Sequence, residues 1–217
     1  MLLSFISFII LHSIVFNNYY FINCGDIQSL SGKPDNYPYF YQWNHHNQTF
    51  IKKTHKAIAP DAPSLQKDFY TAKPSMPFRS HSQRRIQDML VLDIFNNKSH
   101  GYFVDLAAND WSHLSNSFVI EYYKHWEGVC IEPNPEYLLG LLSNRKCHIF
   151  TNPVSSANND IIKFNINGVF GGIIGNDYDN KVGKNTVDMY TVTLTSILDL
   201  VHAPNVCILY LCLIYTQ

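Results

Sequence analysis

The feature that most constrains the fold of this chain is a regular alternation of short apolar runs and amphipathic segments in its middle part. Strand-like runs at 102–106, 128–132 and 147–150 are separated by segments with helical spacing at 112–126 and 135–145. A chain that alternates strand and helix in this order forms a parallel sheet with right-handed crossovers. We therefore predict an α/β fold with a mostly parallel sheet and the strand at 102–106 in its centre.

The flanking segments extend this pattern. Apolar residues at helical spacing predict a helix over 83–94, and a second short helix is predicted at 195–201. Two strand-like runs, 161–167 and 188–194, surround a Gly- and Asn-rich stretch and predict an added hairpin or lobe at the edge of the sheet. The apolar run at 206–215 is too short to span a membrane and is typical of a fully buried parallel strand.

The N-terminus is almost wholly apolar from Met1 to Phe16. A run of about 15 apolar residues has the length of a signal-peptide core and is short for a membrane span. Ile22 and Cys24 occupy the positions expected just before a cleavage site. We predict that residues 1–24 are a signal peptide or, if they are not cleaved, a signal anchor that would be the chain's only link to a membrane.

Residues 25–81 are polar, carry several prolines and show no helical or strand period. They predict an irregular linker or stalk between the N-terminal segment and a domain over 82–217. His45 and His46 lie in this stalk without further ligands at a useful spacing, so we predict a solvated loop and no metal site.

Two sequons, at Asn47 and Asn97, predict glycosylation and agree with a lumenal or secreted chain. The five cysteines leave two alternatives open, because Cys130 and Cys147 can pair or remain buried free thiols. The formal net charge of -1 argues against a nucleic-acid partner, because proteins that bind nucleic acids usually carry an excess of basic residues.

Acidic residues stand where two of the predicted strands end. Asp105 and the turn Ala107-Ala108-Asn109-Asp110 end the first strand, and Glu132 ends the next. In open parallel sheets, ligands bind outside the carboxyl ends of the strands, where strand order reverses. A carboxylate offers two oxygens to the hydroxyls of a ribose, so the pattern favours a nucleoside cofactor. The alternative is that Asp105 and Asp110 form turns and cap helices.

The same turn indicates which nucleoside cofactor fits the site. A dinucleotide needs a pyrophosphate cradle made of glycine amides, and the stretch from Leu106 to Trp111 has no glycine. S-adenosylmethionine has no phosphate and needs only close approach of the backbone, which the small side chain of Ala107 permits. The turn therefore favours S-adenosylmethionine over NAD.

Taken together, these residues resemble the first half of an FkbM-type methyltransferase domain, which reads "VD.GANDG", "SNT", a helical Glu and "W.G..IEPNP". The matching positions are Val104-Asp105, Ala108-Asn109-Asp110, Ser115-Asn116, Glu121, Trp126, Gly128 and Ile131 to Pro135. The resemblance extends from about Ser82 to the end of the chain. It implies a doubly wound, Rossmann-like methyltransferase fold, S-adenosylmethionine as cofactor and methyl transfer to an oxygen, often on a sugar. It also implies that Asp105, Ala107 to Asp110, Glu132 and Pro133 line the cofactor.

The chain departs from the family pattern in two places. Ala107 and Trp111 replace family glycines, and Leu209, Ile214 and Thr216 stand where acids would face the active site. The chain then ends, so we predict a C-terminally truncated domain.

No residue can be assigned as the base, or as ligands of a metal, that would activate a hydroxyl for methyl transfer. Asp177, Asp179 and Asp188 are the candidates that remain for the role of base, and surface turns explain them better. The predicted function is O-methylation of a glycan or other small hydroxyl acceptor in the secretory pathway. The alternatives are a catalytically inactive nucleoside-binding module and a truncated, non-functional family member.

Overall fold

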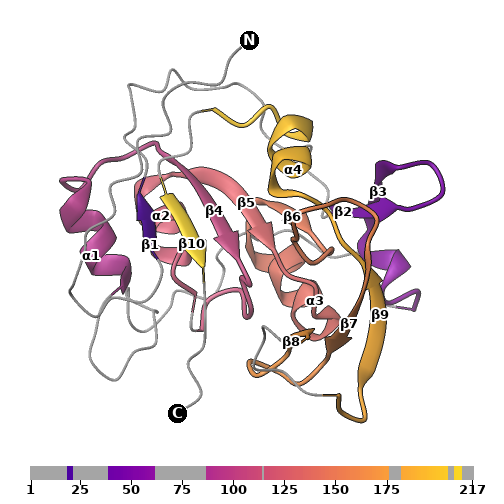
Figure 1. Ribbon diagram of the computed structural model, residues 1–217. Coiled ribbons are helices and arrows are strands. Elements are labelled where there is room, and N and C mark those ends of the chain that lie inside the picture. Colours follow the sequence, from indigo (N-terminus) through magenta and orange to yellow (C-terminus); the bar gives the residue numbers. More distant parts are fainter. Residues whose placement is uncertain are drawn as a thin grey trace.

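The computed structural model describes residues 19–21, 39–61, 87–113, 115–175, 182–204 and 208–211. In these ranges the chain is an α/β protein with a seven-stranded, mostly parallel sheet and a separate three-stranded antiparallel sheet (Figure 1). The strands of the large sheet lie in the order β1-β10-β4-β5-β6-β2-β3. Their bounds are β1 Tyr19–Phe21, β2 Tyr39–Asn44, β3 Thr49–Thr54, β4 Tyr102–Leu106, β5 Glu127–Ile131, β6 His148–Phe150 and β10 Ile208–Leu211.

The centre of the large sheet is parallel. Strands β10, β4, β5, β6 and β2 pair in parallel, whereas β1 and β3 are antiparallel edge strands. Because β4 has parallel neighbours on both sides, the prediction that 102–106 is an interior strand is confirmed. The chain runs from β4 to β5 and β6 in one direction, and β10 then pairs on the other side of β4. Strand order therefore reverses next to β4, the position at which parallel sheets bind ligands.

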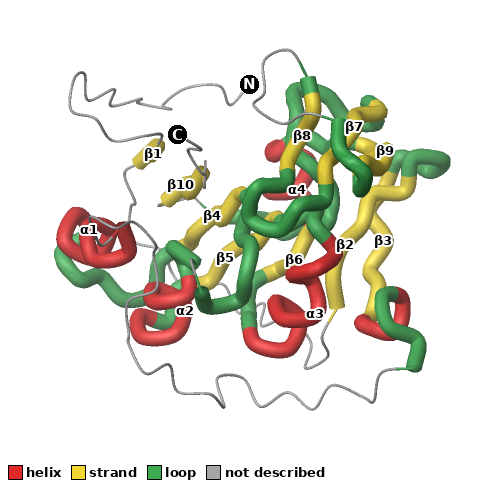
Figure 2. Tube along the Cα trace, turned by 90° about the horizontal axis from the view of Figure 1, so that it is seen from below, coloured by secondary structure: helices red, strands yellow, loops and turns green. Residues whose placement is uncertain are grey.

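Helices cover both faces of the parallel strands, and Figure 2 shows α2 and α3 on one side and α4 on the other. Side chains alternate across the strands: Phe103, Cys130 and Ile149 belong to the core cluster on the α2 and α3 face. Val104 and Ile131 belong to a second cluster, which includes Ile197 of α4. Both faces are buried, as a parallel sheet requires, and the architecture is compatible with a Rossmann-like fold. The helices are α1 Gln87–Ile94, α2 Phe118–Lys124, α3 Pro135–Asn144, α4 Leu194–Leu200 and the short 3-10 helix η1 His55–Ala57.

The helix predicted at 112–126 is shorter than its apolar stripe. It begins at Phe118, whose backbone N–H donates to Ser115 Oγ at 3.1 Å. It ends before His125, which has a left-handed φ of 56°. Trp126 still packs in the core, where its indole N–H donates to the Lys98 carbonyl at 2.9 Å. The residues before Phe118 are therefore free to form a loop beside the end of β4.

The interpretation of 25–81 as irregular is wrong for residues 39–54. These residues form the hairpin β2–β3, and β2 pairs with β6 to extend the large sheet. Phe40 packs in one core cluster, whereas Tyr41 and Trp43 pack against the other. Because aromatic residues face both sides of β2, the strand has no alternation of polar and apolar residues, and its period is hidden in the sequence.

The predicted lobe is confirmed as a three-stranded antiparallel sheet in the order β8-β7-β9. Its second strand-like run ends earlier than predicted, because Thr193 begins helix α4 and its Oγ1 accepts the N–H of Ser196 at 3.1 Å. The strands are β7 Ile161–Asn165, β8 Gly172–Ile174 and β9 Thr186–Tyr190.

Most of the predicted N-terminal segment lies outside the described residues. Of residues 1–24, the structure describes only 19–21, which pair with β10 as strand β1. No helix among the described residues has the length and apolar character needed to cross a lipid bilayer. At the other end of the chain, Leu209 lies in β10 opposite Val104, whereas Ile214 and Thr216 fall outside the described residues.

Candidate functional site

The carboxyl ends of β4 and β5 meet at a buried carboxylate. Glu132 directly follows β5 and is only 3% exposed. Its Oε2 accepts the backbone N–H of Asn109 at 2.8 Å, and its Oε1 accepts that of Asn134 at 2.7 Å. One side chain therefore joins the loop after β4 to the residue that caps α3. Glu132 therefore lies beside the turn at 107–110.

The loop after β4 has an unusual backbone. Ala107 has a φ of 61° and Asn109 a φ of 51°, both in the left-handed region. The N–H groups of Ala107 and Ala108 donate to the Ile131 carbonyl at 2.9 and 3.1 Å, which fixes the loop against the end of β5. Glycine adopts a left-handed φ without steric cost, so the geometry explains why a glycine would suit position 107. In this chain the alanine carries that strain.

Replacement of Ala107 by glycine is expected to raise the free energy of unfolding by about 0.5–1 kcal/mol. A left-handed backbone costs a residue with a Cβ roughly 1–2 kcal/mol, and glycine removes this cost. Part of the gain is offset because glycine also has more conformational freedom in the unfolded chain. Ala108→Gly is the matched control, because Ala108 is buried and its φ is not positive. This variant should be less stable by about 1 kcal/mol. Chemical denaturation of both variants measures the difference, and equal losses of stability would contradict the proposed strain at Ala107.

Asp105 lies in a buried polar network rather than in an open pocket. The Ser117 hydroxyl donates to Asp105 Oδ2, and Nη2 of Arg145 donates to Ser117 Oγ at 2.8 Å. Arg145 Nε forms a 2.6 Å ion pair with Glu121 Oε2. The side chains of the pair are 0% and 2% exposed. The network connects the end of β4 to α2 and to the end of α3.

Arg145 is a residue that the sequence interpretation missed. Its guanidinium also contacts Ser115 Oγ at 3.1 Å and the carbonyl of Trp111 at 3.4 Å. Glu121, in turn, accepts the backbone N–H groups of Lys146 and Cys147 at 3.1 and 2.7 Å. Glu121 belongs to the matched motif, and a lone carboxylate in the apolar stretch that begins α2 is a signal that a cationic partner is needed. Nothing in the sequence indicates that the partner is Arg145.

Two other predicted residues have structural contacts of their own. Asp110 Oδ1 accepts the N–H groups of Ser112 and His113 at 3.0 and 2.7 Å, which is the turn-forming alternative. Trp111 packs against the core and lies edge-on to Phe118, with ring centroids 5.7 Å apart. The bulky indole at a family glycine position therefore packs against the helical layer.

Burial raises the pKa of both acids at the strand ends. For Glu132 the pKa rises to about 7, although the N–H groups of Asn134 and Asn109 oppose the shift. For Asp105 it rises to about 6, and the nearby Arg145 and the Ser117 hydroxyl oppose the shift. Desolvation penalises the charged form of a carboxyl group. Raised pKa values of this kind are common at functional sites and also in structural networks.

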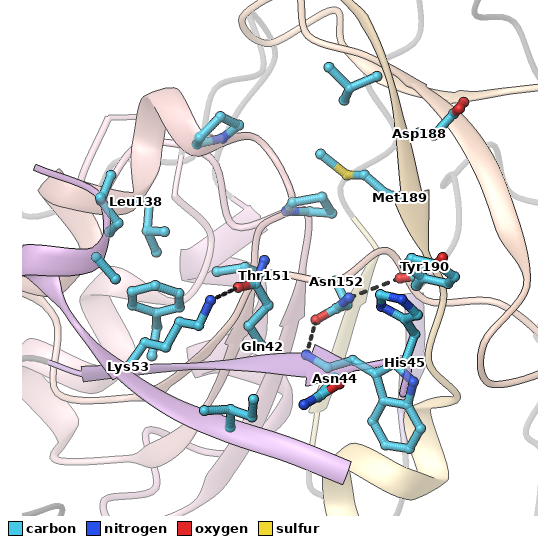
Figure 3. Close-up of a pocket in the computed structure, with 18 of the residues that line it drawn as sticks. Gln42, Asn44, His45, Lys53, Leu138, Thr151, Asn152, Asp188, Met189 and Tyr190 are labelled. Carbon is cyan, nitrogen blue, oxygen red and sulfur yellow. Dashed lines mark hydrogen bonds between the residues drawn. The ribbon is translucent and has the colours of Figure 1, made fainter. Parts of the chain in front are cut away.

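A cavity of about 710 Å³ adjoins this region (Figure 3). Pro133, next to Glu132, is one of its lining residues, and the others come from the β2–β3 hairpin, η1, α3, the residues after β6 and the small sheet. Asp188 also lines it. Asp188 lies in β9, within the strand-like run predicted at 188–194 and not in a surface turn. Its Oδ1 pairs with Lys163 Nζ at 3.1 Å. Asp177 and Asp179 lie outside the described residues.

The structure also places the two sequons, two of the cysteines and one histidine of the hairpin. Asn47 lies in the exposed turn of the β2–β3 hairpin, and Asn97 is exposed just after α1. Cys130 and Cys147 are joined in a disulfide, so the structure selects one of the two alternatives that the sequence left open.

The His45 ring stacks on Tyr190 with centroids 4.0 Å apart, so it packs on β9 instead of lying in a solvated loop. Within the described residues, no three His, Cys, Asp or Glu side chains gather in a way that could hold a metal.

Comparisons of the chain with protein-family models, curated proteins and solved structures found no match.

Proposed function

We propose that this chain binds S-adenosylmethionine at the carboxyl ends of β4 and β5 and is a methyltransferase of the FkbM type that it resembles. The observation that carries the proposal is the position of Glu132. This buried carboxylate follows β5 and contacts the loop after β4, the strand next to which strand order reverses. A nucleoside bound there would find an acceptor for its ribose hydroxyls and a loop with a small side chain at position 107.

The donors and acceptors at this site fit a nucleoside. Each Glu132 oxygen accepts one backbone N–H, and a carboxylate has about four acceptor positions in all, so two positions can accept hydroxyl donors. Ala107, Asp110 and Pro133 are partly exposed and would form the rim of the site. When bound, S-adenosylmethionine would supply an activated methyl group. NAD fits less well, because the loop has no glycine amides to cradle a pyrophosphate.

The acceptor and the compartment are part of the same proposal. The Cys130–Cys147 disulfide supports an oxidising compartment, and the exposed sequons at Asn47 and Asn97 agree with it. We therefore propose a lumenal or secreted chain, anchored to a membrane only if residues 1–24 are retained. The proposed acceptor is a hydroxyl of a glycan or another small molecule. The base that would activate it is not assigned to a residue.

Glu132→Ala is expected to weaken binding of S-adenosylmethionine by at least about tenfold, because charge-assisted hydrogen bonds to the ribose contribute roughly 1.5–3 kcal/mol each. Titration calorimetry with S-adenosylmethionine, its demethylated product and NAD measures the effect. NAD should bind more weakly than the other two. Glu127→Ala is the matched control, because Glu127 is exposed at the other end of the same strand. Equal affinity of wild type and Glu132→Ala for S-adenosylmethionine, or tighter binding of NAD, would contradict the proposal.

A pH series provides a second readout of the same site. The ribose hydroxyls donate best to the charged carboxylate, and the pKa of Glu132 without ligand is about 7. Affinity for S-adenosylmethionine should therefore rise between pH 6 and pH 8. In Glu132→Gln, which cannot titrate, the affinity should be lower and independent of pH over this range. Circular dichroism of each variant distinguishes lost binding from lost structure.

A further inference from the structure

The β2–β3 hairpin, which the sequence suggested was part of a stalk, forms one wall of the cavity shown in Figure 3. The cavity volume of about 710 Å³ lies in the range of small-molecule sites, roughly 300–1,000 Å³. From the side chains that line it, we propose that this cavity binds a small organic anion, with a carboxylate or phosphate group beside Lys53.

The anion-binding group in the proposed site is the ammonium of Lys53. It donates to Gln42 Oε1 at 2.6 Å, a neutral acceptor on the neighbouring strand. Among the described residues, no carboxylate pairs with Lys53. An ammonium group has three N–H donors, so this side chain retains the capacity to bind an anion. Gln42 holds it in place and still offers its own amide N–H₂ to the same ligand.

The surroundings of Lys53 are apolar. Phe40 lies directly opposite Lys53 on β2, and Ile58 and Leu138 line the same cavity. These walls would contact the body of an organic ligand and reduce the exposure of its anionic group to water. Charge-assisted hydrogen bonds gain strength where water is excluded.

The negative charge of the cavity lies away from Lys53. Figure 3 shows Asp188 and Lys53 on opposite sides. Asp188 is paired with Lys163, so a cation already offsets its charge. An anion beside Lys53 would therefore contact an apolar wall and the N–H donors of Lys53 and Gln42. It would not lie next to the Asp188 carboxylate.

The cavity is held open by contacts between distant segments. Asn152 Oδ1 accepts the N–H of Trp43 at 2.7 Å, and Asn152 Nδ2 donates to the Tyr190 carbonyl at 2.9 Å. One side chain thus joins the hairpin, the residues after β6 and the small sheet. The stacking of His45 on Tyr190 also joins the hairpin to the small sheet. A site with fixed walls loses little conformational entropy when a ligand binds.

The inference does not rest on the proposed methyl donor. Pro133, the residue after Glu132, lines the cavity, so an anion bound there could serve as an acceptor, but binding is measured without S-adenosylmethionine. Failure of one proposal therefore leaves the other untouched.

The test is a ligand-observed NMR titration with benzoate, phenyl phosphate and benzamide. Benzamide has the same ring and nearly the same shape as benzoate but no charge. Benzoate should bind at least about tenfold more tightly than benzamide. In Lys53→Gln this preference should disappear, whereas Lys53→Arg should keep most of it. Comparison of benzoate with phenyl phosphate then shows which anionic group the site prefers.

Lys52→Gln is the matched control for charge. Lys52 is the next residue of the same strand, and its ammonium lies 3.5 Å from the ring centroid of Tyr39 instead of lining the cavity. Both substitutions change the net charge equally, so only a local effect separates them. Equal affinity for benzoate and benzamide in wild type, absence of binding by both anions, or an equal loss in Lys52→Gln and Lys53→Gln would each overturn the proposal.

Discussion

Replacement of Arg145 by methionine is expected to lower the free energy of unfolding by about 3–5 kcal/mol. The guanidinium is fully buried and contacts Glu121, Ser115 and Ser117. Methionine fills part of the volume but leaves the Glu121 carboxylate buried without its cation, and it removes the positive charge beside Asp105. The loss of a partner from a buried ion pair is costly because the remaining charge is not solvated.

Chemical denaturation with a matched ion-pair variant measures this effect. Lys163→Met removes the cation of the exposed pair with Asp188, whose side chains are 60% and 63% exposed. Solvent screens that pair, so the cost should be below about 1 kcal/mol. Adding Glu121→Gln to Arg145→Met should recover part of the loss, since the stranded charge is then absent. If Arg145→Met were no more destabilising than Lys163→Met, the network would not be a main support of the site.

The second large effect is expected from the disulfide. The Cys130–Cys147 bond links residues 17 positions apart and joins β5 to the residue before β6. Its removal in Cys130→Ala/Cys147→Ala should lower the free energy of unfolding by about 3 kcal/mol, because the unfolded chain regains the freedom of the closed loop. Cys147 also donates its N–H to Glu121, so the disulfide and the Arg145 network support the same end of β6.

Denaturation with and without reductant distinguishes the bond from the loss of side-chain volume. Reductant should destabilise the wild type strongly and the double alanine variant little. The double variant also controls for the other three cysteines, which it retains. If reductant lowered the stability of both proteins equally, the two thiols would not be paired in solution.

The sequence by itself determined the elements of the parallel sheet and the position of the proposed cofactor site. Strand β4 and helix α3 were predicted within a few residues of their bounds, because hydrophobic periodicity is a local property of the chain. Asp105 and Glu132 stand at strand ends, and the ends of neighbouring parallel strands meet at one edge of the sheet. Their proximity to the loop at 107–110 therefore followed from local patterns and one topological rule.

Only the tertiary structure decided what those acids contact. The position of Arg145 in the sequence does not show that its side chain turns inward to Glu121, since the partners of a buried charge come from different elements. The roles of Asp105, in a buried network, and Asp110, in a turn, likewise depend on neighbours that folding brings together. The left-handed φ of Ala107 is imposed by its contact with the end of β5, and alanine itself gives no signal of it.

The hairpin and the cavity depend on the tertiary structure to the same degree. Strand β2 lies beside β6 through the pairing of Tyr41 with Phe150, more than a hundred residues apart in the sequence. A strand that is covered on both faces has no alternating pattern, so local periodicity cannot identify it. The walls around Lys53 come from the hairpin, α3 and the small sheet, and the chemistry of that cavity exists only when these segments meet.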